Sequence, residues 1–465
     1  MNTTATAVSA TTPTQHNSRY VIAIAAIATF GGFLFGYDLS LMGGAISYLR
    51  DQFHLNEAAV GFTAASAALG CMCGPFLGSW FCDRIGRERT LMVAAAMLAA
   101  GALMTAFAPN LFLFNVFRIL GGVGVGLCSI ASPMYIAEVA PAKVRGRLGV
   151  MYQLAIVVGS TAAPLAAYVI VGHFSDAVSW RWMFGSQMIV VVLFALFLLL
   201  LPPSPRWLAE KGRFEEASRV LTRVHGAEAA EVEMREIKAA LQEETGGFSE
   251  LFQPGIRFAL VIGLLLAFFN NWTGWSAMGG YIPIILQMAG VQERQSAILQ
   301  FSATYVAMAV FGLLSMFLID RAGRRPLWIF ASILMALVTF LAGLVFHYQI
   351  HGFLVLLVLV LCALPHGLAL GPLPWLMMSE IFPTRIRARA VAVTTTFLWI
   401  VIFACAQCFP IISGWSQKHL GSIAGSFWLF TIICIGSTIF GIKMLPETRN
   451  RTLEDIGRSL SGSKD

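Results

Sequence analysis

The chain has 465 residues, of which 57% are apolar and only 12% charged, and its mean hydropathy is +0.75. Soluble domains carry about 25% charged residues, so this composition excludes a soluble enzyme of several domains. The net charge of +7 comes from basic residues in short loops between apolar runs. That distribution is typical of membrane helices and argues against a nucleic-acid-binding surface.

Apolar runs follow one another along the chain, each long enough to cross a bilayer as a helix, which takes about 20 residues. A β-barrel is excluded, because its strands would alternate apolar and polar residues. One long polar stretch, 202–257, has apolar residues at helical spacing and separates six runs from six. The twelve expected spans are 20–49, 58–82, 90–107, 111–137, 148–171, 181–201, 258–287, 295–319, 327–347, 353–379, 390–412 and 421–445.

This pattern predicts an all-α membrane protein with twelve transmembrane helices in two six-helix bundles. No cleavable signal peptide is expected, since the first 19 residues are polar and no small-residue cleavage site follows them. The expected parts are an N-terminal tail (1–19), a first bundle (20–201), a helical linker (202–257), a second bundle (258–445) and a C-terminal tail (446–465).

The basic residues orient these spans. Of the 31 Lys and Arg residues, 26 fall on the side of the termini and the linker, and four (Arg50, Arg181, Arg294 and Lys418) fall on the other side. Because loops rich in Lys and Arg stay in the cytoplasm, both termini and the linker are expected there. The remaining one, Arg118, lies inside a span.

The two halves of the sequence also repeat each other. The segment "GSWFCDRIGR" at 78–87 returns as "DRAGRRP" at 320–326, and "AEVAPAKVRGR" at 137–147 returns as "SEIFPTRIRAR" at 379–389. The offset between the copies is nearly constant. The repeat therefore predicts two pseudo-symmetric bundles, which in transporters form a substrate site at their interface.

Five motifs, in order along the chain, carry a family resemblance: "FGYDLSLMGGAI", "FRILGGVGVG", "PPSPRWL", "GPLPWLMMSEIFPTRIRARA" and "LPETRNRTL". With these motifs the sequence resembles the sugar porter family of the major facilitator superfamily, from about residue 20 to residue 456. The resemblance implies the major facilitator fold and alternating access between two bundles. It also implies roles for particular residues.

Charged residues at the cytoplasmic ends of the spans are the first of these. In the family such residues close the inward gate, and several ion pairs breaking together can shift a two-state equilibrium although each is worth only about 0–1 kcal/mol. Glu88 departs from the family's usual basic residue, so a weaker network is expected in the first half. The expected gate residues are Asp83, Arg87, Glu138, Arg145, Asp320, Arg324, Glu380 and Arg387.

Asp38 and Arg118 are the acid and the base placed deep within spans. Isolated charges in a membrane cost about 2.5–3.5 kcal/mol each, so they are usually paired and functional. A buried carboxylate that alternates between an arginine partner and none changes its affinity for a proton. The family's proton-coupled members have Asp at this position, so the pair is expected to couple transport to protons; the alternative is a structural ion pair.

Sugar binding requires amides for the hydroxyls and aromatic faces for the ring. The family's helix 7 pair of glutamines is Asn270 and Asn271 here, its later asparagine is Ser276, and its helix 8 asparagine is an apolar residue near Met308. The cavity is therefore expected to be less polar than a typical hexose site. Interhelical hydrogen bonding is the alternative role for the asparagines. The expected substrate residues are Phe35, Gln153, Asn270, Asn271, Ser276, Gly371, Trp375 and Trp399.

The tenth span holds two further features. His366 follows Pro365, and a histidine there is either a second proton site or a polar residue at a helix interface. The segment "GPLP" at 371–374 is expected to break the helix just before Trp375. In the family this break gates the site.

No catalytic triad, metal-ligand spacing or phosphate-binding loop is found, so neither an enzyme nor a cofactor is expected. "GGVGVG" lies within an apolar span and is interpreted as a helix-packing surface, and the eight cysteines as small packing residues. The sequence thus predicts a monomeric, proton-coupled symporter of a monosaccharide or polyol in the plasma (inner) membrane, in contact with lipid and not with nucleic acid. The alternatives are a proton symporter of a non-hexose metabolite, a facilitative sugar uniporter and a non-transporting sugar sensor.

Overall fold

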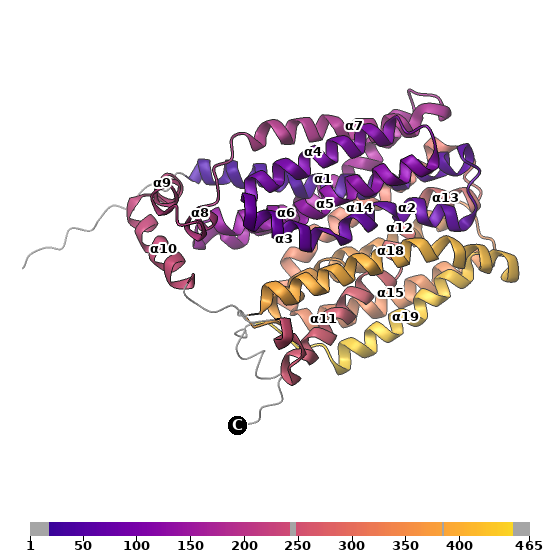
Figure 1. Ribbon diagram of the computed structural model, residues 1–465. Coiled ribbons are helices and arrows are strands. Elements are labelled where there is room, and N and C mark those ends of the chain that lie inside the picture. Colours follow the sequence, from indigo (N-terminus) through magenta and orange to yellow (C-terminus); the bar gives the residue numbers. More distant parts are fainter. Residues whose placement is uncertain (1–17, 242–247, 384–385, 450–465) are drawn as a thin grey trace, which may run out of the picture.

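The structure, a computed structural model, describes residues 18–241, 248–383 and 386–449, and all regular elements within them are helices (Figure 1). The N-terminal half comprises α1 (Ser18–Gln52), α2 (Glu57–Met72), α3 (Gly74–Ile85), α4 (Arg87–Ala106), α5 (Leu111–Val139), α6 (Ala142–Val171) and α7 (Asp176–Leu198). The linker helices are α8 (Pro205–Glu210), α9 (Phe214–His225) and α10 (Ala227–Ala240). The C-terminal half comprises η1 (Phe248–Phe252), α11 (Pro254–Trp272), α12 (Trp275–Gly279), α13 (Ile282–Met288), α14 (Arg294–Ala322), α15 (Arg324–His347), α16 (Phe353–Pro365), η2 (His366–Leu370), α17 (Pro372–Glu380), α18 (Arg387–Leu420) and α19 (Ala424–Lys443).

Eleven helical stretches within the described residues are long and apolar enough to cross a membrane. The expected seventh span, 258–287, is not one continuous helix but is divided into α11, α12 and α13. The first break is at Gly274, whose φ of 118° is strained for any residue with a Cβ atom. The expected second span is likewise two helices that meet at Cys73, where Pro75 lies at the start of α3. The chain still crosses twelve times, and the seventh crossing is formed by α11, α12 and α13 in succession.

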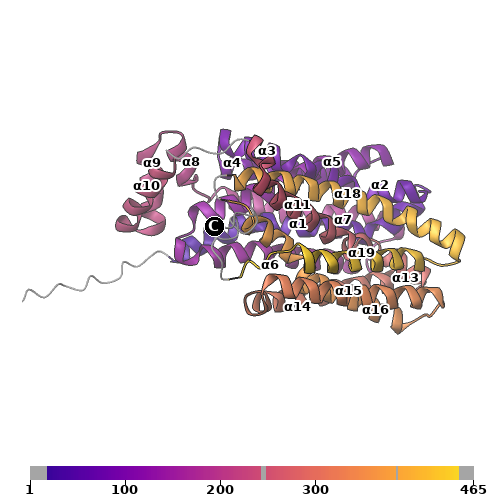
Figure 2. The same ribbon diagram turned by 90° about the horizontal axis from the view of Figure 1, so that it is seen from below.

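The two halves meet along two pairs of helices. In the described structure α2 packs along α18, and α6 packs along α14 (Figure 2). At Gly61 of α2, a side chain would collide with the backbone carbonyl of Gln407 in α18. The glycine therefore permits close contact between the halves at this point.

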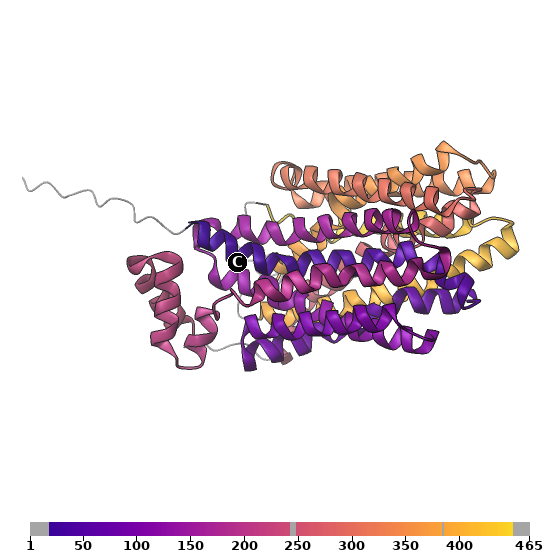
Figure 3. The ribbon, with the colours of Figure 1, turned by 90° about the horizontal axis from the view of Figure 1, so that it is seen from above.

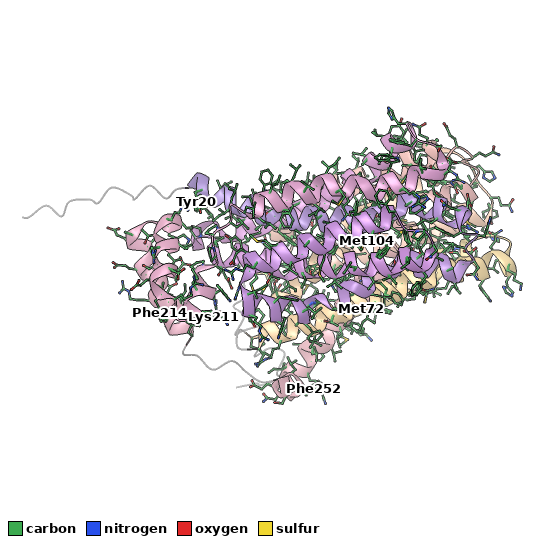
Figure 4. The ribbon with its side chains drawn as sticks, turned by 45° about the horizontal axis from the view of Figure 1, so that its top comes forward. Tyr20, Met72, Met104, Lys211, Phe214 and Phe252 are labelled. Atoms are coloured by element: carbon green, nitrogen blue, oxygen red, sulfur yellow. The ribbon has the colours of Figure 1, made fainter. Side chains whose placement is uncertain are left out.

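The linker forms a small helical cluster at one end of the bundle, as predicted for a helical segment between the halves (Figure 3). Its own core includes Trp207, Leu221 and Met234. We call this end of the molecule, where α1 begins and α19 ends, the linker end, and the other end the opposite end. In Figure 4, Tyr20 and Phe214 are both labelled at the linker end, and Arg223 of α9 lies 4.5 Å from the centre of the Tyr20 ring.

Candidate substrate and proton site

A buried ion pair joins α1 to α5 within the N-terminal half. Arg118 Nη1 donates to Asp38 Oδ1 at 2.7 Å, and the two side chains are 3% and 2% exposed. The guanidinium of Arg118 also lies 5.1 Å from the centre of the Phe184 ring. The structure thus brings together the two deep charges that the sequence singles out.

The hydrogen bonding of this pair is incomplete. Asp38 Oδ2 and Arg118 Nε are buried and have no hydrogen-bond partner. A buried charge depends strongly on its partner, because losing that partner leaves it uncompensated. Oδ2 is therefore the unpaired oxygen of a carboxylate whose other oxygen accepts from one arginine nitrogen.

The expected aromatic residues of the site meet across the two halves. Phe35 of α1 and Trp399 of α18 have ring centres 5.5 Å apart, and both side chains are buried. Gln153 of α6, the expected sugar-binding amide of the N-terminal half, is exposed. The structure therefore leaves this amide accessible while the aromatic pair is closed.

The expected amides of the C-terminal half bond to backbone groups. Asn270 Nδ2 donates to the carbonyl of Leu370 at 2.7 Å and to that of Gly371 at 3.2 Å. Asn271 Nδ2 donates to the carbonyl of Ala267 in its own helix at 3.1 Å. In this structure Asn270 acts as the interhelical hydrogen-bonding residue that the sequence left as an alternative, tying α11 to the break in the tenth span.

The tenth span breaks as expected, but earlier along the chain. Its helix widens into a π turn over His366–Leu370, closed by the Gly371 N–H donating to the His366 carbonyl at 2.8 Å, and α17 starts at Pro372. Trp375 on α17 and Ser276, two residues beyond the Gly274 break, are both half-buried. Two helix interruptions thus flank the expected site.

Two aromatic residues at this place were not found from the sequence. Trp275 stacks on His366 with ring centres 6.0 Å apart. The ring centres of Trp275 and Tyr305 of α14 are 5.7 Å apart. His366 Nδ1 is buried without a hydrogen-bond partner. Aromatic residues are common in apolar helices, so nothing in the sequence pattern separates Trp275 from a packing residue.

At the linker end of the N-terminal half, Arg87 is the centre of an ionic network. Its side chain, 4% exposed, pairs with Glu138 at 2.8 Å, with Glu210 of α8 at 3.4 Å and with the exposed Asp83 at 4.0 Å. Trp207 of α8 donates from Nε1 to the Asp83 carbonyl at 3.1 Å. The linker is therefore bound directly to this network.

The C-terminal half repeats the arrangement. Arg324 pairs with Glu380 at 3.2 Å and with Asp320 at 3.3 Å. Arg324 and Glu380 are 13% and 22% exposed, so this pair is less buried than Arg87–Glu138. The repeated charges of the sequence therefore form the same pair in each half.

A hydroxyl group completes each network, and the sequence analysis did not assign it. Ser204 Oγ donates to Glu138 Oε2, and Thr448 Oγ1 donates to Glu380 Oε2 at 2.6 Å. The two hydroxyls follow the sixth and twelfth spans, within the motifs "PPSPRWL" and "LPETRNRTL". Their matching places in the two motifs were the signal that could have found them.

In the described structure these ion pairs do not join the halves, so the expected closing of the inward gate is not seen as ion pairs between them. Arg87–Glu138 lies within the N-terminal half and Arg324–Glu380 within the C-terminal half. Arg387 donates from Nε to the carbonyl of Phe382, also in its own half, at 3.2 Å. The side chain of Arg145 lies outside the described residues.

Glu88 has a local role at the start of α4. Its carboxylate lies against Gly86, where a Cβ atom would be 2.9 Å from Glu88 Oε2. In the C-terminal half the corresponding carboxylate comes from Glu447, which accepts from the N–H groups of Arg324 and Arg325 at 3.0 and 3.1 Å. Glu88 Oε2 is buried without a hydrogen-bond partner, and the Arg87–Glu138 pair beside it is shorter and more buried than Arg324–Glu380. The expected weakening of the first network by Glu88 stays a prediction.

The opposite end has ion pairs that do cross between the halves. Arg294 at the start of α14 pairs with Asp51 of α1 and, at 3.5 Å, with Asp176 of α7. Its guanidinium also lies 4.7 Å from the centre of the Tyr48 ring. Gln407 of α18 adds a hydrogen bond to the carbonyl of Ala58 at 2.9 Å.

A cavity of about 440 Å³ lies at this same end, away from the expected substrate residues. Its lining includes Arg50, Tyr281, Met288, Phe409 and Lys418. No group of three or more metal-ligating side chains was found among the described residues. Of the eight cysteines, Cys73 is exposed and Cys408 half-buried; the others are buried, as expected for packing residues.

Comparison with known proteins gives a consistent result along the whole chain. The profile of the family described as "Sugar (and other) transporter" matches residues 24–460. The arabinose-proton symporter of Bacillus subtilis (strain 168) is 36% identical over 448 residues, covering 95% of each chain. The D-xylose-proton symporter of Escherichia coli (strain K12) is 32% identical over 477 residues, covering 95% of this chain and 96% of that one.

Solved structures agree with the fold. The proton:xylose symporter XylE bound to 6-bromo-6-deoxy-D-glucose has a TM-score of 0.78 at 31% identity, covering 96% of this chain and all of that one. The partially occluded inward-open form of XylE from E. coli has a TM-score of 0.83 at 31% identity, covering 93% of this chain and all of that one. The described helices therefore have the major facilitator fold of a multi-pass membrane protein.

Proposed function

The chain belongs to the sugar (and other) transporter family, and on that premise we propose that it carries a monosaccharide or related polyol across a membrane together with a proton. The observation that carries the proposal is the buried Asp38–Arg118 pair with its unpartnered carboxylate oxygen. Relatives named as arabinose-, xylose- and galactose-proton symporters match over almost the whole of both chains, which supports the same class of substrate.

Asp38 is the proton carrier in this proposal. While Arg118 holds the carboxylate, the charged form is favoured; when the pair opens in a dry cavity, the neutral form is favoured and a proton is taken up. Movement of the two halves then links proton binding to the side on which the cavity opens. A facilitative uniporter would keep the pair intact as a structural tie between α1 and α5.

The substrate binds between the halves, with Gln153 on one side and the two helix breaks on the other. Its expected contacts are Phe35, Gln153, Asn270, Asn271, Ser276, Gly371, Trp375 and Trp399. The short amide of Asn270, engaged with backbone carbonyls, favours a substrate with fewer contacts here than a hexose makes. A symporter of a non-hexose metabolite is therefore the second candidate.

The gate proposal concerns the linker end. The ion pairs of Arg87 and Arg324 stiffen each half. In the outward-facing state the molecule is open at the opposite end, and the two halves come together at the linker end. The present structure, with ion pairs across the opposite end, represents the inward-facing state. In support, its TM-score is 0.82 with the inward-open form of XylE and 0.78 with the sugar-bound form.

The proposed setting is the plasma (inner) membrane, with a monomer whose termini and linker lie in the cytoplasm. The excess of Lys and Arg at the linker end supports this orientation. Cysteines placed at the exposed positions 228 and 292 test it by labelling from one side of the membrane. Labelling of both positions from the same side would contradict the two-bundle topology.

Transport by purified protein in proteoliposomes tests the proposed function. Uptake of radiolabelled arabinose, D-xylose and galactose, and of a panel of polyols and small acids, is measured with and without an imposed pH gradient. A symporter accumulates its substrate above equilibrium only with the gradient, and a protonophore abolishes the accumulation. Equilibration without accumulation would instead identify a uniporter.

A further inference from the structure

Two helix breaks meet at one place in the C-terminal half. Trp275 follows the Gly274 break, and His366 begins the π turn of the tenth span. Asn270 connects the two segments, because its amide donates to the carbonyls of Leu370 and Gly371. Helix breaks expose backbone polar groups, which in a membrane must find partners.

Several backbone groups at the break of the tenth span are paired within the chain, but Nδ1 of the His366 imidazole is not. The carbonyls of Leu370 and Gly371 accept from Asn270, and the Gly371 N–H donates to the His366 carbonyl. His366 Nδ1, in contrast, is buried and has no hydrogen-bond partner. Buried polar groups in proteins are mostly hydrogen-bonded, so His366 Nδ1 has the capacity for one more hydrogen bond than the chain supplies.

Close packing fixes the position of this imidazole. Trp275 stacks on one face of it, with the ring planes inclined by 30°. A methyl group on Gly371 would lie 3.1 Å from His366 Nε2, and one on Gly367 would lie 2.9 Å from the Met308 carbonyl of α14. Both glycines thus let the ring and the π turn lie tightly against their neighbours, so the imidazole is held in one orientation.

The surroundings favour an uncharged hydroxyl as the missing partner. His366 forms no ion pair with any residue that the structure describes, so there is no built-in carboxylate to keep it charged. The neighbouring N-terminus of α17 is a poor anion site, because Pro372 and Pro374 remove two of its first three N–H groups. A neutral imidazole has one donor and one acceptor nitrogen, which suits a sugar hydroxyl.

We propose that His366 is a specificity-determining residue whose imidazole hydrogen-bonds one hydroxyl of an uncharged monosaccharide bound at the junction of the two helix breaks. This inference rests on the proposed function, because it assigns a contact within the same substrate site. It makes His366 a substrate contact, which is neither of the two roles considered from the sequence, a second proton site or a polar residue at a helix interface. Sites that hydrogen-bond a hydroxyl discriminate strongly against analogues that lack it.

A mutant cycle tests the proposal. Wild type and His366→Phe are compared by competition against uptake of whichever of arabinose, D-xylose and galactose the wild type transports, using the parent sugar and each of its monodeoxy analogues. In the wild type, one analogue should bind about 5- to 150-fold more weakly than the parent sugar. In His366→Phe the affinity for the parent sugar should fall by a similar factor. The analogue that lacks the contacted hydroxyl should then bind no more weakly than the parent sugar.

Controls separate recognition from folding and from proton transfer. His366→Gln keeps a hydrogen-bonding group and should recover part of the affinity. His419→Phe is the matched control, since His419 also stacks on a tryptophan (Trp415, 4.6 Å between ring centres) but lies exposed at the opposite end. It should leave every affinity unchanged, and His366→Phe should still accumulate sugar when a pH gradient is imposed.

Three results would overturn the proposal. If His366→Phe retains the full penalty for every deoxy analogue, His366 contacts no hydroxyl. If accumulation is lost while sugar affinity is unchanged, His366 carries a proton and not a specificity contact. If the wild type transports no sugar at all, the proposed function fails first and takes this inference with it, whereas the first two results leave sugar transport standing.

Discussion

The two ends of the molecule hold their charges in different ways. At the linker end, Arg87 and Arg324 each pair with a glutamate of their own half. At the opposite end, Arg294 of the C-terminal half pairs with Asp51 and Asp176 of the N-terminal half. In the described structure the first set of ion pairs stiffens each half, while the second set connects the halves.

The ion pairs of the linker end are also more buried than those of the opposite end. Arg87 and Glu138 are 4% and 9% exposed, whereas Arg294 and Asp51 are 27% and 59% exposed. Removing one partner of a buried pair costs about 3–5 kcal/mol, but an exposed pair contributes only about 0–1 kcal/mol. The contacts that a rocking motion must break are therefore the weak ones, and those that must persist are the strong ones.

The largest expected effect comes from the pair that lies between the two ends. Asp38→Asn keeps the shape of the side chain and removes its ionisation, so proton-driven accumulation should be abolished, while sugar binding and exchange down a gradient persist. Proteoliposome uptake with an acidified exterior measures this. Glu228→Gln, a change at an exposed carboxylate of the linker helix α10, is the control and should still accumulate sugar.

Accumulation by Asp38→Asn would show that the proton is carried elsewhere and that the ends are not coupled through this pair. Arg118→Ala completes the test. Without the arginine, Asp38 should remain protonated, and the protein should be uncoupled or inactive.

The next largest effect concerns the buried network of the linker end. Glu138→Ala leaves Arg87 buried without its main partner and should lower stability by about 3–5 kcal/mol. Glu380→Ala should lower it less, because Arg324 and Glu380 are more exposed than Arg87 and Glu138. Thermal unfolding of the purified variants measures the difference, and equal losses would contradict the ranking by burial.

Replacement of Glu380 or of Arg387 with alanine is also expected to affect the gate at the linker end. If these residues help to close the linker end, either change should shift the population toward the inward-open state and reduce uptake, with sugar binding kept within about tenfold, or about 1.4 kcal/mol. Increased accessibility of the cavity from the opposite end would mean that the assigned gate is wrong.

A smaller effect is expected between the ends, at Gln153. This amide is exposed on α6, whereas Asn270 and Asn271 are buried and bonded to backbone groups. Loss of one hydrogen-bond partner of the sugar should cost about 1–3 kcal/mol, or about 5- to 150-fold in affinity. Gln417→Ala, at the far end of α18, is the control; an unchanged affinity in Gln153→Ala would remove α6 from the site.

The smallest effect is expected from the exposed pairs of the opposite end. Arg294→Ala removes two cross-half pairs of about 0–1 kcal/mol each, so the population open at that end should rise by several-fold. Distances between spin labels at His54 and Gln292, one in each half, report this opening. Arg50→Ala is the matched control, because Arg50 pairs with Glu57 inside one half at 3.1 Å and is similarly exposed.

If Arg50→Ala and Arg294→Ala raised the population open at the opposite end equally, opening would not depend on whether an ion pair lies within one half or between the halves. That result would contradict the distinction drawn between the two ends. A response to Arg294→Ala alone would support it, and would assign the closed opposite end to contacts that one residue supplies.

Much of the architecture follows from the sequence, because burial in a membrane is recorded along the chain as runs of apolar residues. The number of crossings, the helical linker and the repeated Glu and Arg positions all come from such local patterns. The sequence also singled out Asp38 and Arg118, since two charges deep in apolar spans stabilise one another only by meeting. The structure confirms that contact at 2.7 Å.

Only the tertiary structure decided which groups pair, because pairing depends on how the helices tilt and rotate against one another. It placed the Asn270 amide on the broken tenth span, brought Ser204 and Thr448 to Glu138 and Glu380, and left His366 Nδ1 without a hydrogen-bond partner. It also divided the seventh span at Gly274, where a positive φ interrupts a run that by composition alone is one helix. The sequence determined which residues enter the membrane, whereas packing between helices determined whether each charge holds one half together or connects the two.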